Sequence, residues 1–164
     1  SAGSMLSSAF HFDMVRPGIA LYGALAVNNP TKIFKKVIKW QARIIQVQHA
    51  KAGEKIGYGG TYLLTRDSII ATIGVGYADG YNRKLGGKAS VRLGNQRAPV
   101  IGRVSMDSIT VDVTDITDSN LQSGTVDLLH ENYDLFNMAI DAETISYEIL
   151  TGIGKRPTRY YQNA

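Results

Sequence analysis

The sequence predicts a mainly β domain, a closed or nearly closed barrel or a sandwich, with helical segments near its two ends. The first supporting observation is a series of β-prone segments that recur roughly every eight to twelve residues between glycine-containing turns. The second is a change to helical spacing of apolar residues near the C-terminus. With 164 residues, the chain is long enough for one domain with its own core.

The strands are predicted from alternation and from turn signals. Residues 37–47 alternate apolar and polar side chains, which is typical of a strand with one buried face. Gly94-Asn95 lies between two β-prone runs and indicates a two-residue hairpin turn. The expected strands cover residues 37–47, 68–75, 90–93, 96–100, 108–113 and 125–129.

The two ends are expected to contain short helices. Residues 5–10 fit a short helix, and the Pro17-Gly18 turn could present the amides of Gly18 and Ile19 to an anion at a helix N-terminus. Near the other end, residues 141–151 have helical spacing. Thr144 or Ser146 would cap this helix, Tyr147 would lie in its first turn, and Gly152 or Gly154 would end it.

Composition excludes several classes of protein. The chain has no cysteine, which excludes disulfides and thiolate metal sites and fits a cytoplasmic protein. No apolar run is long enough to span a bilayer, and no secretory leader precedes the first strand. The net charge of +4 comes from dispersed basic residues, which favours solvated surface over a nucleic-acid site. His11, His49 and His130 lack metal-ligand spacing, so no metal site is expected.

Two tyrosines flanked by glycines are the candidate functional residues. Tyr58 lies in Gly57-Tyr58-Gly59-Gly60, and Tyr77 follows Gly76 in Gly-Tyr-Ala-Asp-Gly. From this pattern alone, both could be aromatics beside turns of a sheet. A tyrosine hydroxyl can also transfer a proton, but an ordinary pKa near ~10 makes it an unusual base unless its surroundings tune it.

Several strings of residues, taken in order, resemble the alanine racemase family. They match the C-terminal β-domain of that family and the last piece of the barrel before it, over nearly the whole chain. The strings are Met14-Val15-Arg16-Pro17-Gly18-Ile19-Ala20-Leu21-Tyr22-Gly23, Gly57-Tyr58-Gly59 with Thr61-Tyr62, Gly76-Tyr77-Ala78-Asp79-Gly80, residues 100–107 (Val-Ile-Gly-Arg-Val-Ser-Met-Asp), Ser146-Tyr147-Glu148-Ile149-Leu150 and Lys155-Arg156-Pro157-Thr158-Arg159.

The resemblance implies an isomerase that interconverts L-alanine and D-alanine for peptidoglycan synthesis. The family's enzyme holds pyridoxal 5'-phosphate on a lysine of an α/β (TIM-type) barrel and works as a homodimer. Such a barrel needs about 250 residues, so we expect residues 1–26 to be its truncated end and residues 27–164 to be the C-terminal β-domain. The chain starts without Met and reads as a piece of a longer protein. Because no lysine matches the family's cofactor lysine, we expect this piece alone to be inactive and to hold no cofactor.

The resemblance also assigns residues to the reaction. Tyr58 matches the base that acts on the L enantiomer and that comes from the partner subunit. Tyr77 and Met106 match residues that contact the substrate, where the Met106 amide and the tyrosine hold its carboxylate. Residues that match the lining of the substrate access channel are Arg83, Arg103 and Ile145.

A second group of residues matches the cofactor site. Arg16 matches the arginine that faces the pyridine nitrogen, where a permanently protonated guanidinium discourages protonation of the ring. The amides of Gly18 and Ile19 and the hydroxyl of Tyr147 match groups that bind the phosphate. Ser1 falls where the family has a phosphate-binding serine, if no gap intervenes.

Two other functions stay open at this point. A small basic β-barrel could bind RNA or single-stranded DNA, although no basic stripe with interleaved aromatics is present and we expect no nucleic-acid or membrane partner. A racemase for serine or another amino acid would share the same motifs. A related β-domain occurs in pyridoxal-phosphate decarboxylases, but the Met106-Asp107 pair favours a racemase. Residues 129–138 depart from the usual family pattern.

Overall fold

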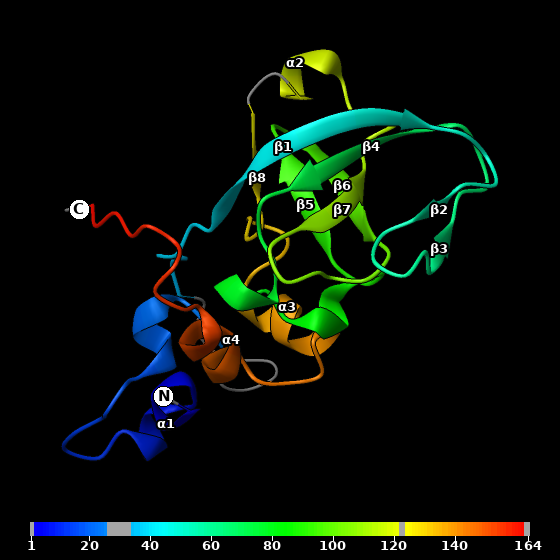
Figure 1. Ribbon diagram of the computed structural model, residues 1–164. Helices are drawn as coiled ribbons and strands as arrows, with labels where there is room; N and C mark the ends of the chain where they lie inside the picture. The colour runs from blue at the N-terminus through cyan, green and yellow to red at the C-terminus, as the bar shows by residue number, and fades with distance from the viewer. Residues whose placement is uncertain (1, 26–33, 122–123, 163–164) are drawn as a thin grey trace.

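A closed antiparallel barrel forms the centre of the protein (Figure 1). The computed structural model describes residues 2–25, 34–121 and 124–162. The strands follow the order β1-β4-β7-β6-β5-β8 around the barrel, which confirms the predicted fold and selects the barrel over the sandwich. The barrel strands are β1 (Gln41–Ala50), β4 (Ser68–Ile73), β5 (Ser90–Leu93), β6 (Gln96–Ile101), β7 (Ile109–Asp112) and β8 (Thr125–Asp127).

The β5–β6 hairpin forms as the turn signal predicts. Leu93 pairs with Gln96 across Gly94 and Asn95, and Gly94 has the positive φ of 55° that such a turn needs. Strand β4 is buried on both faces for most of its length, in agreement with its continuous apolar run. It ends at Ile73, two residues earlier than expected.

Strand β1 begins later than the sequence predicted and continues further. Residues 37–40 are outside the strand, although Trp40 is buried. The register with β4 shifts between Ile44 and Gln46, and the side chains of residues 45–49 beyond it are all exposed. The alternation therefore stops where β1 no longer pairs with β8 and pairs with β4 alone. Beyond it lies the small hairpin of β2 (Lys55–Ile56) and β3 (Tyr62–Leu63) at the outer end of β1 and β4 (Figure 1).

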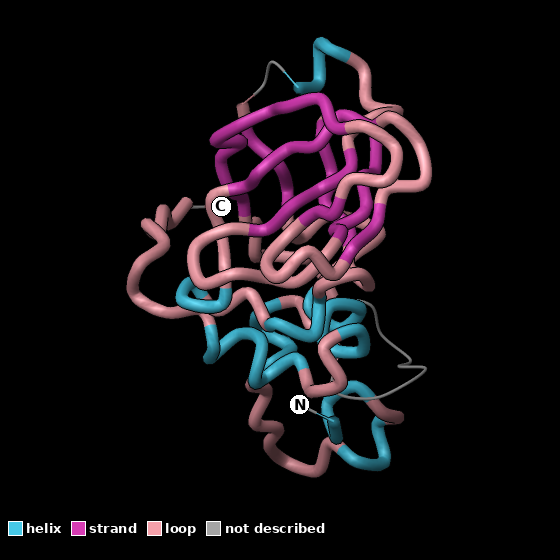
Figure 2. The backbone as a smooth tube through the Cα atoms, turned by 45° about the vertical axis from the view of Figure 1, so that its right-hand side comes forward, coloured by secondary structure: helices cyan, strands magenta, loops and turns pink. Residues whose placement is uncertain are grey.

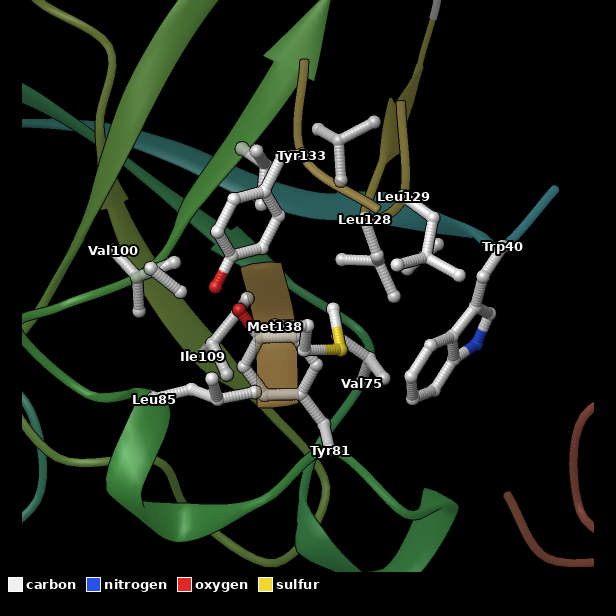
Figure 3. Packing of buried hydrophobic residues seen from close by; sticks show 14 of the residues in the cluster. Trp40, Val75, Tyr81, Leu85, Val100, Ile109, Leu128, Leu129, Tyr133 and Met138 are labelled. Carbon is white, nitrogen blue, oxygen red and sulfur yellow. The ribbon is translucent and has the colours of Figure 1, made fainter. Parts of the chain in front are cut away.

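Two helices close one end of the barrel: α3 (Leu135–Asp141) and α4 (Ser146–Gly152) (Figure 2). Three apolar side chains of α3 are buried, and Figure 3 shows Met138 among Trp40, Tyr81 and Leu128 of the core. The rings of Trp40 and Tyr81 meet edge to face, with centroids 5.9 Å apart. Barrel interior and helical end therefore form one continuous core.

The predicted single helix over residues 141–151 is wrong, because the chain forms two helices with a turn between them. Glu143 in this turn has a φ of 55°, which a helix cannot contain. Asp134 caps α3 by accepting hydrogen bonds from the amides of Phe136 and Asn137. The N-cap of α4 is Ile145, without a side-chain hydrogen bond, so neither Thr144 nor Ser146 is the cap. Tyr147 lies in the first turn, as predicted.

The N-terminal segment packs against the helical end. It contains α1 (Ala2–Met5) and two 3₁₀ turns, η1 (Ser8–Phe10) and η2 (Ile19–Tyr22). Residues 5–10 therefore hold the end of α1 and the turn η1 in place of one helix. Met5 and Ile19 belong to the same buried cluster as Ile149 of α4. The predicted domain boundary at 26/27 lies outside the described residues and stays a prediction. The remaining helical turns are η3 (Tyr77–Asp79), η4 (Arg83–Leu85) and α2 (Asp118–Leu121). Within the described ranges, no helix is both long and apolar enough to cross a membrane.

The turn between α3 and α4 is attached to η4 by ion pairs of Glu143. Its carboxylate accepts hydrogen bonds from Lys84 Nζ at 2.8 Å and Lys88 Nζ at 2.7 Å, and these bonds lower the pKa of Glu143 to about 2. A lowered pKa in the folded state means that the ionised carboxylate stabilises the fold above the unfolded value of 4.5 and that this contribution disappears as the pH falls toward 2.

Replacing Glu143 with Gln is therefore expected to destabilise the chain at neutral pH and to matter less in acid. Urea unfolding of both proteins between pH 7 and pH 2 measures this. The difference should be constant above the unfolded pKa, should shrink below it, and should be smaller at high salt because the pairs are exposed. A difference that is independent of pH would contradict the ion-pair explanation.

Candidate active site

Tyr58 lies at the tip of the β2–β3 hairpin with its side chain in solvent. Gly57 and Gly59 have φ values of 79° and 75°, a region that glycine adopts without strain, and the Gly60 amide donates to the Gly57 carbonyl at 3.0 Å. The Tyr58 side chain is 70% exposed. The flanking glycines thus form a tight turn that projects the ring away from the chain's own core.

This turn rests on the loop that follows β6. A Cβ atom at Gly57 would lie 3.4 Å from the backbone of Gly102 and of Arg103. A Cβ atom at Gly59 would lie 3.5 Å from Nη1 of Arg103, so the Arg103 guanidinium lies against the Tyr58 turn. The structure therefore brings together Tyr58 and Arg103, one of the residues predicted for the access channel.

Tyr77 and Met106 are neighbours through their backbones. The Tyr77 amide donates to the Ser105 carbonyl, and the Ala78 amide donates to the Met106 carbonyl, both at 3.0 Å. Gly76 has no room for a side chain, because a Cβ atom there would lie 2.2 Å from the Met106 carbonyl oxygen. The side chains of Tyr77 and Met106 are 43% and 52% exposed, so both face outward from this junction.

The 3₁₀ turn η3 in turn contacts the end of α4. A Cβ atom at Gly80 would lie 2.3 Å from the Gly152 carbonyl oxygen. Tyr81, the next residue, is fully buried, so it anchors η3 in the core, and burial raises the pKa of its hydroxyl. The guanidinium of Arg83 lies 5.9 Å from the centroid of the Tyr77 ring, within range of a cation–π contact. The Tyr58 turn, the 102–107 loop, η3 and α4 therefore form a continuous band, which we call the tyrosine band.

The residues predicted for the cofactor site lie around η2 and on α4. Arg16 and Gly18 are exposed just before η2, and Gly18 is the N-cap of η2. Ile19 is 2% exposed, so only its backbone can face a ligand. Ile19 of η2 and Ile149 of α4 belong to one buried apolar cluster, and Tyr147 on α4 is 42% exposed. Ser1 lies outside the described residues.

A single chain does not bring Tyr58 to Arg16. The β2–β3 hairpin and the N-terminal segment lie far apart, the hairpin at the right of Figure 1 and the N-terminal segment at its lower left. The predicted site residues thus fall into two groups, one with Tyr58, Tyr77 and Met106 and one with Arg16, Gly18 and Ile19. Ile145, predicted for the access channel, is 63% exposed and precedes α4.

The sequence reasoning missed the residues that join the tyrosine band. Arg156 contacts two aspartates. Asp107 directly follows Met106, and Asp79 lies two residues after Tyr77. The sequence does contain one local signal for these contacts, an aspartate one or two residues after each predicted substrate residue. The basic partner could be found only in three dimensions.

Two cavities lie outside the tyrosine band, one of them beside the predicted cofactor residues of the N-terminal segment. One of about 240 Å³ is lined by His130, Lys36 and Arg92, among others, and a second of about 350 Å³ lies under the N-terminal segment. Burial and the nearby Arg92 and Arg97 lower the pKa of His130, whose ring nitrogens have no hydrogen-bond partner within the described chain. Among the residues that the structure describes, no three acidic or histidine side chains form a metal-binding group.

Comparison with known proteins identifies the family. The family model for the alanine racemase C-terminal domain matches residues 37–161, which include the whole barrel and the tyrosine band. The chain belongs to the alanine racemase family.

Curated alanine racemases resemble the chain over almost its full length. The alanine racemase of Brucella ovis is 43% identical over 175 residues, which covers 98% of this chain and 44% of the relative. The alanine racemase of Rhodospirillum rubrum is 41% identical over 162 residues, which covers 98% of this chain and 43% of the relative. The chain thus spans less than half the length of the curated alanine racemases that it matches.

Solved alanine racemase structures have the same fold. The alanine racemase of Bartonella henselae, with covalently bound pyridoxal phosphate, superposes with a TM-score of 0.87 at 39% identity and covers 98% of this chain and 45% of its own. The alanine racemase of Clostridium difficile 630 in complex with cycloserine gives a TM-score of 0.78 at 30% identity, over 88% of this chain and 39% of its own. The nucleic-acid-binding alternative is not favoured by these alanine racemase matches.

Proposed function

We propose that this chain is the C-terminal part of an alanine racemase subunit, and that its protein interconverts L-alanine and D-alanine. The observation that supports this most strongly is the exposed Tyr58. It lies between two glycines with positive φ, in the same band as Tyr77 and Met106. Each of these three residues lies in a sequence string that resembles the alanine racemase family, so we assign all three to the same active site.

The predicted cofactor residues fit pyridoxal phosphate in their chemistry. The guanidinium of Arg16, the amides of Gly18 and Ile19 and the hydroxyl of Tyr147 are all hydrogen-bond donors, which is the set that a phosphate and a ring nitrogen require. When bound, pyridoxal phosphate supplies the electron sink for the electrons of the broken Cα–H bond. Arg16 would contact the ring nitrogen as a donor and would not hand it a proton.

Tyr58 acts in this proposal as the base for L-alanine. Its phenolate oxygen removes the Cα proton of the L enantiomer on one face and becomes a hydroxyl, and that hydroxyl returns a proton to the same face in the reverse direction. Its phenolate would need a nearby cation or hydrogen-bond donor, which this proposal places on the barrel of the full-length protein. The Met106 amide and Tyr77 hold the carboxylate of the substrate and so fix the Cα–H bond toward the base.

The separation of the two groups of residues supports a dimeric enzyme. Since Tyr58 projects away from its own chain, and lies far from the N-terminal segment that carries Arg16, each subunit would contribute Tyr58, Tyr77 and Met106 to the site of the other. The protein would be a homodimer with two composite sites. We place it in the cytoplasm, in keeping with the absence of cysteine from the chain.

The direct test is a racemase assay on the full-length gene product that contains this chain. With added pyridoxal phosphate, we expect it to convert L-alanine to D-alanine and the reverse. Optical rotation or circular dichroism measures the conversion. Serine should be a poorer substrate by kcat/KM. The 164-residue chain alone should show no turnover, because it contains no match for the cofactor lysine. Turnover by this chain alone, or a preference for another amino acid, would overturn the proposal.

A further inference from the structure

Arg156 connects two segments of the tyrosine band that carry predicted substrate contacts. Its Nη1 atom lies 2.7 Å from Oδ1 of Asp107, and its Nε atom lies 3.4 Å from Oδ1 of Asp79. Asp107 directly follows Met106, and Asp79 is the last residue of η3, which begins at Tyr77. One guanidinium therefore joins the Met106 loop to the Tyr77 turn.

Asp79 transmits this contact to the backbone. Its Oδ2 atom accepts a hydrogen bond from the Gly76 amide at 2.9 Å, while Oδ1 faces Arg156. The Asp79 side chain is only 14% exposed. Asp79 thus links the Arg156 guanidinium to the amide of Gly76, the N-cap residue of η3.

Close backbone contacts bring these segments together. The Cβ positions at Gly76 and Gly80 are blocked by the Met106 and Gly152 carbonyls, so η3 lies directly between the 105–107 loop and the end of α4. Arg156 follows α4 and reaches across both contacts. A small shift of Asp107 or Asp79 would therefore change the relative position of Met106 and Tyr77.

Arginine suits this position better than lysine. Two different nitrogen atoms of one planar guanidinium face the two carboxylates, whereas a lysine has one ammonium group and cannot keep both geometries. Because Arg156 and Asp107 are more than half exposed, the pairs add little to global stability. Their effect is expected on local geometry, not on whether the chain folds.

We propose that Arg156 is a positioning residue that sets the distance between the Tyr77 turn and the Met106 loop, and thereby the binding of the substrate carboxylate. This inference rests on the proposed racemase function. Arg156 touches no substrate atom in this role, and it acts through Asp79 and Asp107. Its loss should weaken binding of both alanine enantiomers alike, because both share the same carboxylate contacts.

Steady-state kinetics of the full-length gene product test the role of Arg156. For Arg156→Gln we expect KM to rise about tenfold for both L- and D-alanine, with a much smaller change in kcat. Arg156→Lys should recover part of this loss, since it keeps the charge. Arg159→Gln is the matched control, because Arg159 donates to the Ile153 carbonyl and is paired with neither aspartate. A thermal midpoint close to that of the wild type shows that each variant is folded.

Hydrogen exchange provides a readout that does not depend on activity. The amides of Tyr77 and Ala78 bond to the Ser105 and Met106 carbonyls, so a peptide covering residues 76–80 should exchange faster in Arg156→Gln and not in Arg159→Gln. Unchanged exchange in Arg156→Gln overturns the positioning role, as does an unchanged KM in an active enzyme. A wild-type protein without racemase activity would instead overturn the proposed function, and the exchange rates would still decide whether Arg156 joins the two segments.

Discussion

Replacing Tyr58 with Phe is expected to lower the rate of racemisation by about 10²–10⁴-fold, the range in which a positioned acid–base group contributes. The substitution removes one oxygen atom from a side chain that is 70% exposed, so the fold should not change. The two-base mechanism also makes a directional prediction. Exchange of the Cα hydrogen with solvent deuterium should be lost from L-alanine and largely retained from D-alanine, since a different base serves that face.

The control for this variant is Tyr62→Phe. Tyr62 lies on β3 of the same hairpin, and its side chain is 37% exposed, so it reports any general disturbance of the hairpin. Proton-exchange rates of both enantiomers, measured by NMR in heavy water with the full-length gene product, separate the two steps. Equal loss of exchange from L- and D-alanine in Tyr58→Phe would contradict the assignment of Tyr58 to one face.

Replacing Gly80 with Ala is expected to destabilise the chain by about 2–5 kcal/mol, the sum of overpacking and of strain at a left-handed position. The new Cβ atom would lie 2.3 Å from the Gly152 carbonyl oxygen, and Gly80 has a φ of 98°. The atoms that this Cβ would meet belong to the backbone of Gly152 and Ile153, so they cannot move aside by a side-chain rotation. Each kcal/mol should lower the thermal midpoint by about 2–4 °C in a chain of this size.

Gly87→Ala separates the two causes. Gly87 also has a positive φ, of 74°, but a Cβ atom there would meet nothing within 4 Å. Its replacement should cost only the conformational strain, about 1–2 kcal/mol. Urea unfolding of the two variants gives the comparison. If Gly80→Ala were as mild as Gly87→Ala, the close contact between η3 and α4 would not be part of the folded state in solution.

The elements that the sequence predicted well depend on local rules. The β5–β6 hairpin follows from its Gly94-Asn95 turn, and β4 follows from an apolar run that is buried on both faces. Helix α3 has a local signal as well, the reciprocal cap between Asp134 and Asn137, which periodicity alone did not reveal. The break at Glu143 could not be foreseen, because its ion pairs come from Lys84 and Lys88, far away in the sequence.

The candidate site shows the same division. The glycines around Tyr58 and Tyr77 indicated tight turns, and both tyrosines lie beside such turns. The contact between Gly76 and Met106, and the pairing of Arg156 with two aspartates, join segments that no local pattern relates. These contacts appear only in three dimensions, because β4 and β6 both pair with β7 and the loops after them leave the same end of the barrel.

The shift in register within β1 also bears on how the molecule avoids aggregation. Beyond Ile44, β1 pairs with β4, and its pairing with β8 covers only residues 41–43, so in the described chain the outer half of β1 has one edge without a neighbouring strand. Straight, uncovered edges with apolar side chains such as Ile45 and Val47 recruit strands from other molecules. A bulge bends and twists the strand, so an incoming straight strand cannot follow it. The irregularity therefore protects the uncovered edge of β1 from edge-to-edge association.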